Sequence, residues 1–151
     1  MKRYAFESPP GWEQRPFPAP QQGVYLTAPA GTPKASILLM DAVEIDGELA
    51  AQLERMVDEG CAGAEILQRA AAQPLPRADG LPGMVAVAKV KATHEGKSRE
   101  EGRAFALFEG RNERLPVVFL GDLDALPFHR GAVNRLLASI RLLAVDADLL
   151  Y

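Results

Sequence analysis

Three apolar segments in the second half of the chain, separated by short runs of turn-forming residues, constrain the fold more than any other feature. They are MVAVAKVKA at 84–92, RAFALFE at 103–109 and LPVVFL at 115–120. Segments of this length, rich in β-branched and aromatic residues, are typical of strands. The connections between them, a charged loop expected at 94–102 and a tight turn at 110–114, are too short for a parallel crossover. The pattern therefore predicts an antiparallel meander of at least three strands.

Further strands are expected upstream of the meander. The segment ASILLMDAVEI at 35–45 is apolar on both faces of an extended chain, which indicates a central strand in a sheet covered on both sides, at least in part. Seven of the twelve prolines precede residue 34. Because proline cannot donate to a central ladder, the short segments at 4–6 and 23–27 are expected to be edge strands. The segment at 64–73 is compatible with either a helix or a strand.

Two amphipathic helices complete the pattern. The first is expected at 47–59, capped by Asp46 and ended by Gly60. The second is expected to begin near Pro127, whereas 144–151 has no periodic pattern. Their apolar stripes are Leu49, Leu53, Met56 and Val57 in the first, and Phe128, Ala132, Val133, Leu136, Leu137 and Ile140 in the second.

The order strands, helix, meander, helix predicts an α+β fold. We expect a single domain over residues 1–151, built as an antiparallel β-sheet flanked by helices. Since strands and helices do not alternate, a nucleotide site at the switch point of a parallel sheet is not expected.

Composition limits the kinds of partner that the protein is expected to bind and indicates the cellular compartment. The net charge of −3 and the pI of about 5.4 give no reason to expect binding to nucleic acid or to anionic lipid. The single cysteine, Cys61, excludes an internal disulfide and fits a reducing compartment. The sequence contains neither a secretory leader nor the ~20 apolar residues of a membrane span. We therefore expect a cytoplasmic protein that does not insert into membranes, although a chain trimmed of its leader would look the same.

The sequence carries no recognisable catalytic motif. Cys61 follows a helix end, where the helix dipole disfavours a thiolate. The segment DLDALPFH at 122–129 places Asp122, Asp124 and His129 close together, and these could face a metal ion, but the aspartates also suit ordinary turns. We therefore expect no catalytic residue, no metal site, no cofactor and no enzymatic activity. A small metal-dependent enzyme that uses these three residues is the alternative.

The sheet itself is the best candidate for a binding surface. Two helices need not cover both faces, and an uncovered apolar face would accept a partner's helix or an apolar peptide. The residues expected together on that face, and to bind the partner, are Val85, Val87, Phe105, Leu107, Val117 and Phe119. The proline-rich segment SPPGWEQRPFPAP at 8–20 could instead cover it. We expect this segment to belong to the fold, with Trp12 packed on the sheet, and not to be a free recognition tail.

Five segments carry a resemblance to a known fold. YAFESPPGW, ASILLM, DGLPGM, GRAFALFEGRNERLPVVFL and PFHRGAVNRLLASIRL resemble the PsbP-like and Mog-like fold, and within it the DcrB-like group, which includes the Eag chaperones of type VI secretion effectors. The resemblance implies an antiparallel sheet flanked by helices and a non-catalytic role. Many relatives are exported lipoproteins, but this sequence has no lipid-anchor cysteine near its start, which favours the intracellular branch.

The functional prediction combines these observations. We expect an intracellular adaptor or chaperone that holds an apolar segment of a partner protein against its sheet, with a helix of a secreted effector as one candidate. A homodimer stays open. An envelope protein separated from its leader is a further alternative.

Overall fold

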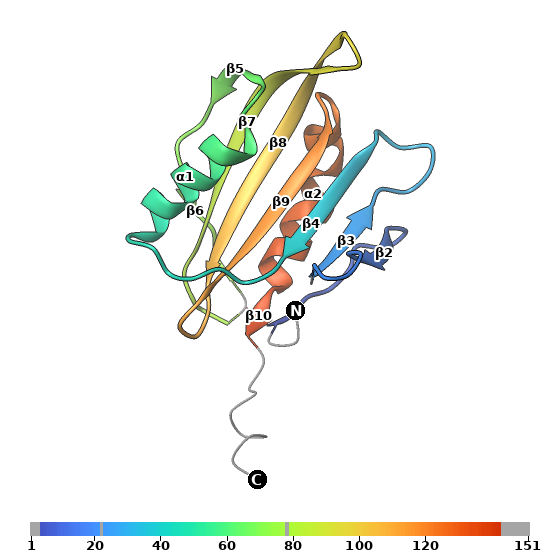
Figure 1. The fold of residues 1–151 in the computed structure, drawn as a ribbon. Coiled ribbons are helices and arrows are strands. Elements are labelled where there is room, and N and C mark those ends of the chain that lie inside the picture. Colours follow the sequence, from blue (N-terminus) through green and yellow to red (C-terminus); the bar gives the residue numbers. More distant parts are fainter. Residues whose placement is uncertain (1–3, 22, 78, 143–151) are drawn as a thin grey trace.

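The computed structural model describes residues 4–21, 23–77 and 79–142 of the chain. An eight-stranded antiparallel sheet forms its centre, in the order β2-β3-β4-β9-β8-β7-β5, with β6 also paired to β7. A separate two-stranded sheet joins β1 to β10, near the two ends of the described chain (Figure 1). The elements are β1 Tyr4–Ala5, β2 Glu13–Pro16, β3 Gly23–Thr27, β4 Ala35–Met40, α1 Leu49–Gly60, β5 Glu65–Arg69, β6 Gln73–Pro74, β7 Gly83–His94, β8 Lys97–Glu109, β9 Arg114–Asp122, α2 Ala125–Ser139 and β10 Arg141–Leu142.

The predicted α+β class and the meander are confirmed. Strands β7, β8 and β9 pair antiparallel in sequence order, while β4 lies beside β9 with Ile37 opposite Phe119. The ambiguous segment 64–73 forms strand β5 and the start of β6. The expected strand at 35–45 ends at Met40, and only Val43 rejoins the sheet, through a single bridge to Arg114.

The charged loop expected at 94–102 is wrong. Strands β7 and β8 continue almost to the tip of a long hairpin, so that His94 pairs with Lys97. Only Glu95 and Gly96 connect them, with φ of 52° and 77°. Positive φ at both central residues is what a tight turn needs to match the twist of two paired strands. The backbone hydrogen bonds between two paired strands do not depend on whether the side chains are polar or apolar. The charged composition of 94–102 therefore led to the wrong prediction of a loop.

The helices lie on opposite faces of the sheet (Figure 1). Helix α1 packs Leu53 and Val57 against Phe105 and Val118, in one apolar cluster. Helix α2 packs Val133, Leu136 and Leu137 into a second and larger cluster on the other face. The expectation of a sheet covered in part on both faces is thus confirmed.

Both helix starts differ in detail from the prediction. Asp46 does not cap α1. Glu48 occupies the N-cap position without a side-chain bond, while Asp46 forms an ion pair with Arg55 at 3.3 Å. Helix α2 begins two residues before Pro127, because proline is tolerated in a first turn, where its missing N–H would have no helical partner.

Candidate functional site

The six residues predicted to bind a partner do not share one face. Phe105 is opposite Ala86 on β7 and Val118 on β9, which places it and Leu107 under α1. The other four, Val85, Val87, Val117 and Phe119, lie in the cluster under α2. The predicted common face is therefore wrong, because the face of each residue depends on strand register, and register is set by contacts between strands that the pattern within each strand does not record.

Four of those six side chains are core. Phe105, Leu107, Val117 and Phe119 are each no more than 3% exposed, and a partner could reach them only if a helix left the sheet. Val85 and Val87 are half-buried beside α2. Val87 also lines a groove of about 390 Å³ with Leu126 and Arg130 of α2.

The surface on the α1 side is only partly covered. Helix α1 packs on β7 and β8, and in Figure 1 strands β9, β4 and β3 lie beside it without a helix in front of them. Directly paired residues of neighbouring strands lie on the same face of the sheet. Val118, which faces α1, is opposite Leu38, and Leu38 is opposite Tyr25, so all three lie on the α1 side. We call the α1-side surface of these strands the open face; its apolar residues are Tyr25, Leu38, Met40, Val43 and Leu120.

Exposed apolar side chains gather at the open face. Met40, Val43 and Leu120 are 40%, 39% and 36% exposed, and Ile45, two residues beyond Val43, is 47% exposed. These are four of the eight large apolar side chains that are exposed among the described residues. The exposure of Met40, Val43 and Ile45 was not predicted, because an apolar run such as 35–45 normally indicates burial on both faces. The alternation of apolar Val43 and Ile45 with acidic neighbours after the strand was the one signal available.

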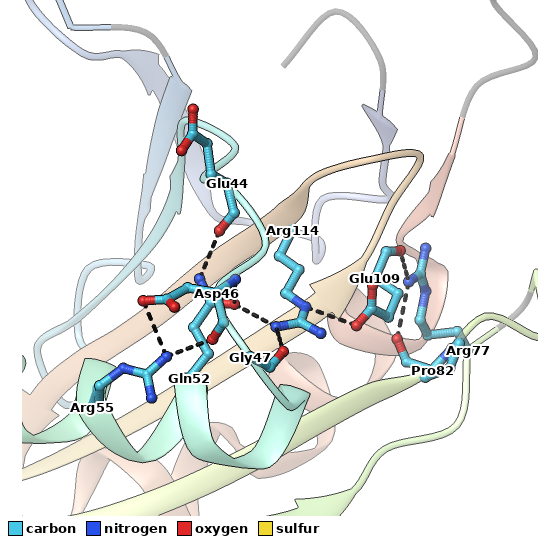
Figure 2. A network of polar contacts seen from close by, with 9 residues as sticks. All are labelled: Glu44, Asp46, Gly47, Gln52, Arg55, Arg77, Pro82, Glu109 and Arg114. Carbon is cyan, nitrogen blue, oxygen red and sulfur yellow. Dashed lines mark hydrogen bonds and ion pairs between the residues drawn. The ribbon is translucent and has the colours of Figure 1, made fainter.

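A polar network fixes one end of the open face (Figure 2). The buried guanidinium of Arg114 pairs with Glu109 at 2.7 Å and donates to the Gly47 carbonyl at 2.8 Å and to Gln52 Oε1 at 2.5 Å. Gln52 in turn donates to the Glu44 carbonyl at 2.9 Å. The segment 41–48, which carries Val43 and Ile45, is thereby held against α1 and the start of β9.

A polar pocket of about 410 Å³ lies at the other end of the open face. It is assembled from the start of β4, the end of α1, the β7–β8 hairpin and the end of β9. Its lining residues are Lys34, Ala35, Ser36, Gly60, His94, Arg99, Glu101, Arg103, Leu120, Gly121 and Asp122. Leu120 and Ser36 are direct cross-strand partners, and through them the pocket is continuous with the open face.

Glu101 is the electrostatic centre of this pocket. Its carboxylate receives Arg103 at 3.0 Å and Arg99 at 3.3 Å, and His94 lies 3.4 Å away. Burial raises the pKa of Glu101, but the hydrogen bonds from Arg103 and Arg99 outweigh it, so the pKa lies below its usual range. Arg103 also donates to the Gly60 carbonyl at the end of α1, at 2.7 Å.

The structure does not bring the candidate metal ligands together. The His129 ring nitrogen Nε2 lies 2.9 Å from the Pro33 carbonyl, whereas Asp122 Oδ1 lies 3.6 Å from Arg99. Across residues 4–21, 23–77 and 79–142, no group of three or more His, Cys, Asp or Glu side chains could hold a metal ion. Cys61 is buried in the α1 cluster.

Trp12 belongs to the fold, as expected. The ring centroids of Trp12 and His129, on α2, lie 5.0 Å apart in a T-shaped arrangement, and those of Phe128 and His129 lie 4.8 Å apart in a similar one. The tryptophan packs against the larger core cluster. Trp12 of the proline-rich segment therefore packs on the α2 side of the sheet. Phe17 of the same segment lies against Tyr25 at the β3 edge of the open face, with ring centroids 5.6 Å apart, and the part of the open face on β4 and β9 stays uncovered.

The helices were also compared with the requirements of a membrane-spanning helix. In the described part of the chain, no helix combines the length and the apolar character that crossing a membrane requires.

Comparison with known proteins identifies the fold but not a family. No protein-family model matches the chain, and no curated protein matches it. The chain is similar to the crystal structure of LpqN, involved in cell envelope biogenesis of Mycobacterium tuberculosis, with a TM-score of 0.61 and 14% identity over 93% of this chain and 83% of that one. This likeness shows the fold alone.

Two solved structures are similar at a lower level. One is a protein of unknown function and putative regulator, PA94 from Pseudomonas aeruginosa, with a TM-score of 0.44 and 16% identity over 85% of this chain and 80% of that one. The other is the solution structure of cyanobacterial PsbP (CyanoP) from Synechocystis sp. PCC 6803, with a TM-score of 0.49 and 11% identity over 94% of both chains. The α+β fold expected from the PsbP-like resemblance is confirmed by the observed sheet and helices and by the likeness to LpqN, whereas none of the three structures bears on the narrower DcrB-like group.

Proposed function

We propose that this protein is a non-catalytic binding module that holds an apolar helix of a partner protein against its open face. The observation that carries the proposal is the exposure of three large apolar side chains, Met40, Val43 and Leu120, along the open face, where Leu38 lies between Leu120 and Met40. Contiguous exposed apolar surface on a small domain marks an interaction site more often than it marks chance.

The dimensions of the open face suit a helix. Neighbouring strands lie about 4.8 Å apart, and a helix with its side chains is about 10 Å wide. Helix α1 occupies the width of two strands, β7 and β8, and β9 and β4 offer the same width next to it. A partner helix on these strands would lie beside α1 in the same layer and bury Leu120 and Met40.

This function would be that of an adaptor or a chaperone that shields an apolar segment before it reaches its destination. An effector of type VI secretion is one partner of this kind, and a cytoplasmic location is part of the proposal. Support comes from the open face itself, where large apolar side chains are exposed on strands that α1 does not cover.

A direct test uses a fluorescent, helix-stapled peptide of alanine and leucine, about 15 residues long, and measures its anisotropy on titration with the protein. We expect Leu120→Asp to weaken binding at least tenfold, since it places a charge in the apolar contact. Ile66→Asp is the matched control, because Ile66 is 41% exposed on β5, at the far edge of the sheet. No binding to the native protein, or an equal loss in both variants, would overturn the proposal.

A further inference from the structure

We propose that the pocket at the end of the open face binds a carboxylate at the C-terminal end of the bound helix, so that the partner lies parallel to α1. This inference rests on the proposed function and adds the polarity of the bound segment and the chemistry of its end. It follows from three observations: the charged residues that line the pocket, the ion pairs that these residues already form, and the direction of α1.

Positive charge exceeds negative charge in the pocket. Lys34, Arg99 and Arg103 line it together with two carboxylates, Glu101 and Asp122, which leaves one positive charge when His94 is neutral. The whole chain carries −3, so the pocket differs in sign from the protein around it. An anionic group is the ligand that this excess favours.

The cations differ in how far they are already engaged. Arg103 is 13% exposed in its side chain and is held by Glu101 and by the Gly60 carbonyl. Arg99 is 61% exposed, and its contacts with Glu101 and Asp122 are long, at 3.3 and 3.6 Å. Lys34 is exposed and forms no ion pair with any residue of the described ranges. Lys34 and Arg99 are therefore the two groups available to a ligand.

Helix α1 shows which end of a helix this place accommodates. Its last residue, Gly60, lines the pocket, and Arg103 donates to the carbonyl there. A helix C-terminus carries partial negative charge on its unpaired carbonyls, and cations stabilise it. A second helix beside α1 with the same direction would bring its own C-terminal carbonyls and carboxylate to Lys34 and Arg99.

The opposite end of the open face does not offer the same charges. The Arg114 guanidinium there is buried and already engaged by Glu109, Gln52 and Gly47. The adjoining segment 41–48 carries the exposed acidic side chains of Asp41 and Glu44, and that of Asp46, which pairs with Arg55. Acidic side chains suit the positive end of a helix dipole. Both ends of the open face thus select the same polarity.

The test compares two stapled alanine–leucine peptides that differ only at the C-terminus, a free carboxylate in one and an amide in the other. We expect the native protein to bind the carboxylate form about three- to tenfold more tightly, as for a partly exposed charge contact. Lys34→Gln with Arg99→Gln should remove the preference without weakening binding of the amide. Phe128→Ser, on the other side of the sheet, should leave the preference unchanged.

The outcomes separate this inference from the proposed function. If both peptides bind the native protein equally, or if the double variant keeps the preference, the inference on polarity is overturned while the proposed function stands. If neither peptide binds, both are overturned.

Discussion

Arg114 and Glu109 face each other across the β8–β9 turn, with Nε and Oε1 2.7 Å apart and the guanidinium side chain only 7% exposed. The same guanidinium holds Gly47 and Gln52, so one side chain ties a turn of the sheet to the segment that enters α1. Polar side chains buried to this extent are stable only when their bonds are satisfied.

Replacing this arginine should be costly. Arg114→Ala leaves the Glu109 carboxylate and the Gly47 carbonyl without their donor, and we expect a loss of about 2–4 kcal/mol in the free energy of unfolding, measured by urea denaturation. Arg15→Ala is the control, since the Arg15–Glu13 pair is exposed on β2 and its loss should leave the free energy of unfolding nearly unchanged. Equal losses would contradict the structural role of Arg114.

Two helix glycines should respond in opposite directions to the same substitution. A Cβ on Gly60 would meet the ring of Phe105, whereas a Cβ on Gly131 has only the Arg135 side chain near it, at 3.9 Å. We expect Gly60→Ala to destabilise by about 1–3 kcal/mol through overpacking, and Gly131→Ala to stabilise by about 0.5–1 kcal/mol through helix propensity. Thermal unfolding of both variants gives the comparison, and the same sign for both would be inconsistent with the close packing at Gly60.

Introducing an aspartate under α1 or beside it should distinguish a core position from a surface position. Phe105 is 1% exposed and packs with Leu53 and Val57, so Phe105→Asp should abolish the cooperative unfolding transition, because the cost of burying an unpaired charge is comparable to the whole stability of a domain. Leu120→Asp should retain it, since that side chain is 36% exposed. Circular dichroism melting curves test both. A folded Phe105→Asp would indicate that α1 does not cover this side chain.

The lowered pKa of Glu101 predicts a dependence of stability on pH. Because its folded pKa lies below the ordinary value of about 4.5, the stabilisation is fully present above that value and is lost as the pH falls through the folded pKa. Glu101→Gln should therefore lower the melting temperature at pH 7, and the difference from the native protein should shrink below about pH 4.5. Glu100→Gln, at an exposed neighbour, should change little. A difference that persists unchanged to pH 3 would refute the contribution of the charged form.

Local pattern was enough for most of the elements. Strands β7, β8 and β9 and helices α1 and α2 follow from alternation and apolar stripes, which are properties of neighbouring residues. The wrong predictions concern features that the pattern of neighbouring residues does not determine. The start of β8 at 97–102 was expected to be part of a loop because it is charged, and Met40 was expected to be buried because its strand is apolar.

The candidate site lay beyond local pattern altogether. Lys34, Gly60, Arg99 and Leu120 line one pocket, yet they come from four separate elements or their flanks. Their meeting depends on the pairing of β4 with β9 and on the end of α1 lying over β8. No spacing in the sequence records such long-range pairings.

By itself, the sequence determined an α+β chain with an antiparallel meander and two amphipathic helices, because hydrophobic periodicity is set residue by residue. Tertiary structure alone decided the rest: which face each strand residue occupies, which strands α1 leaves uncovered, and where the excess positive charge gathers. The reason is that strand register and helix placement are chosen by contacts between distant segments, and the burial or exposure of a side chain such as Phe105 or Leu120 follows only from that choice.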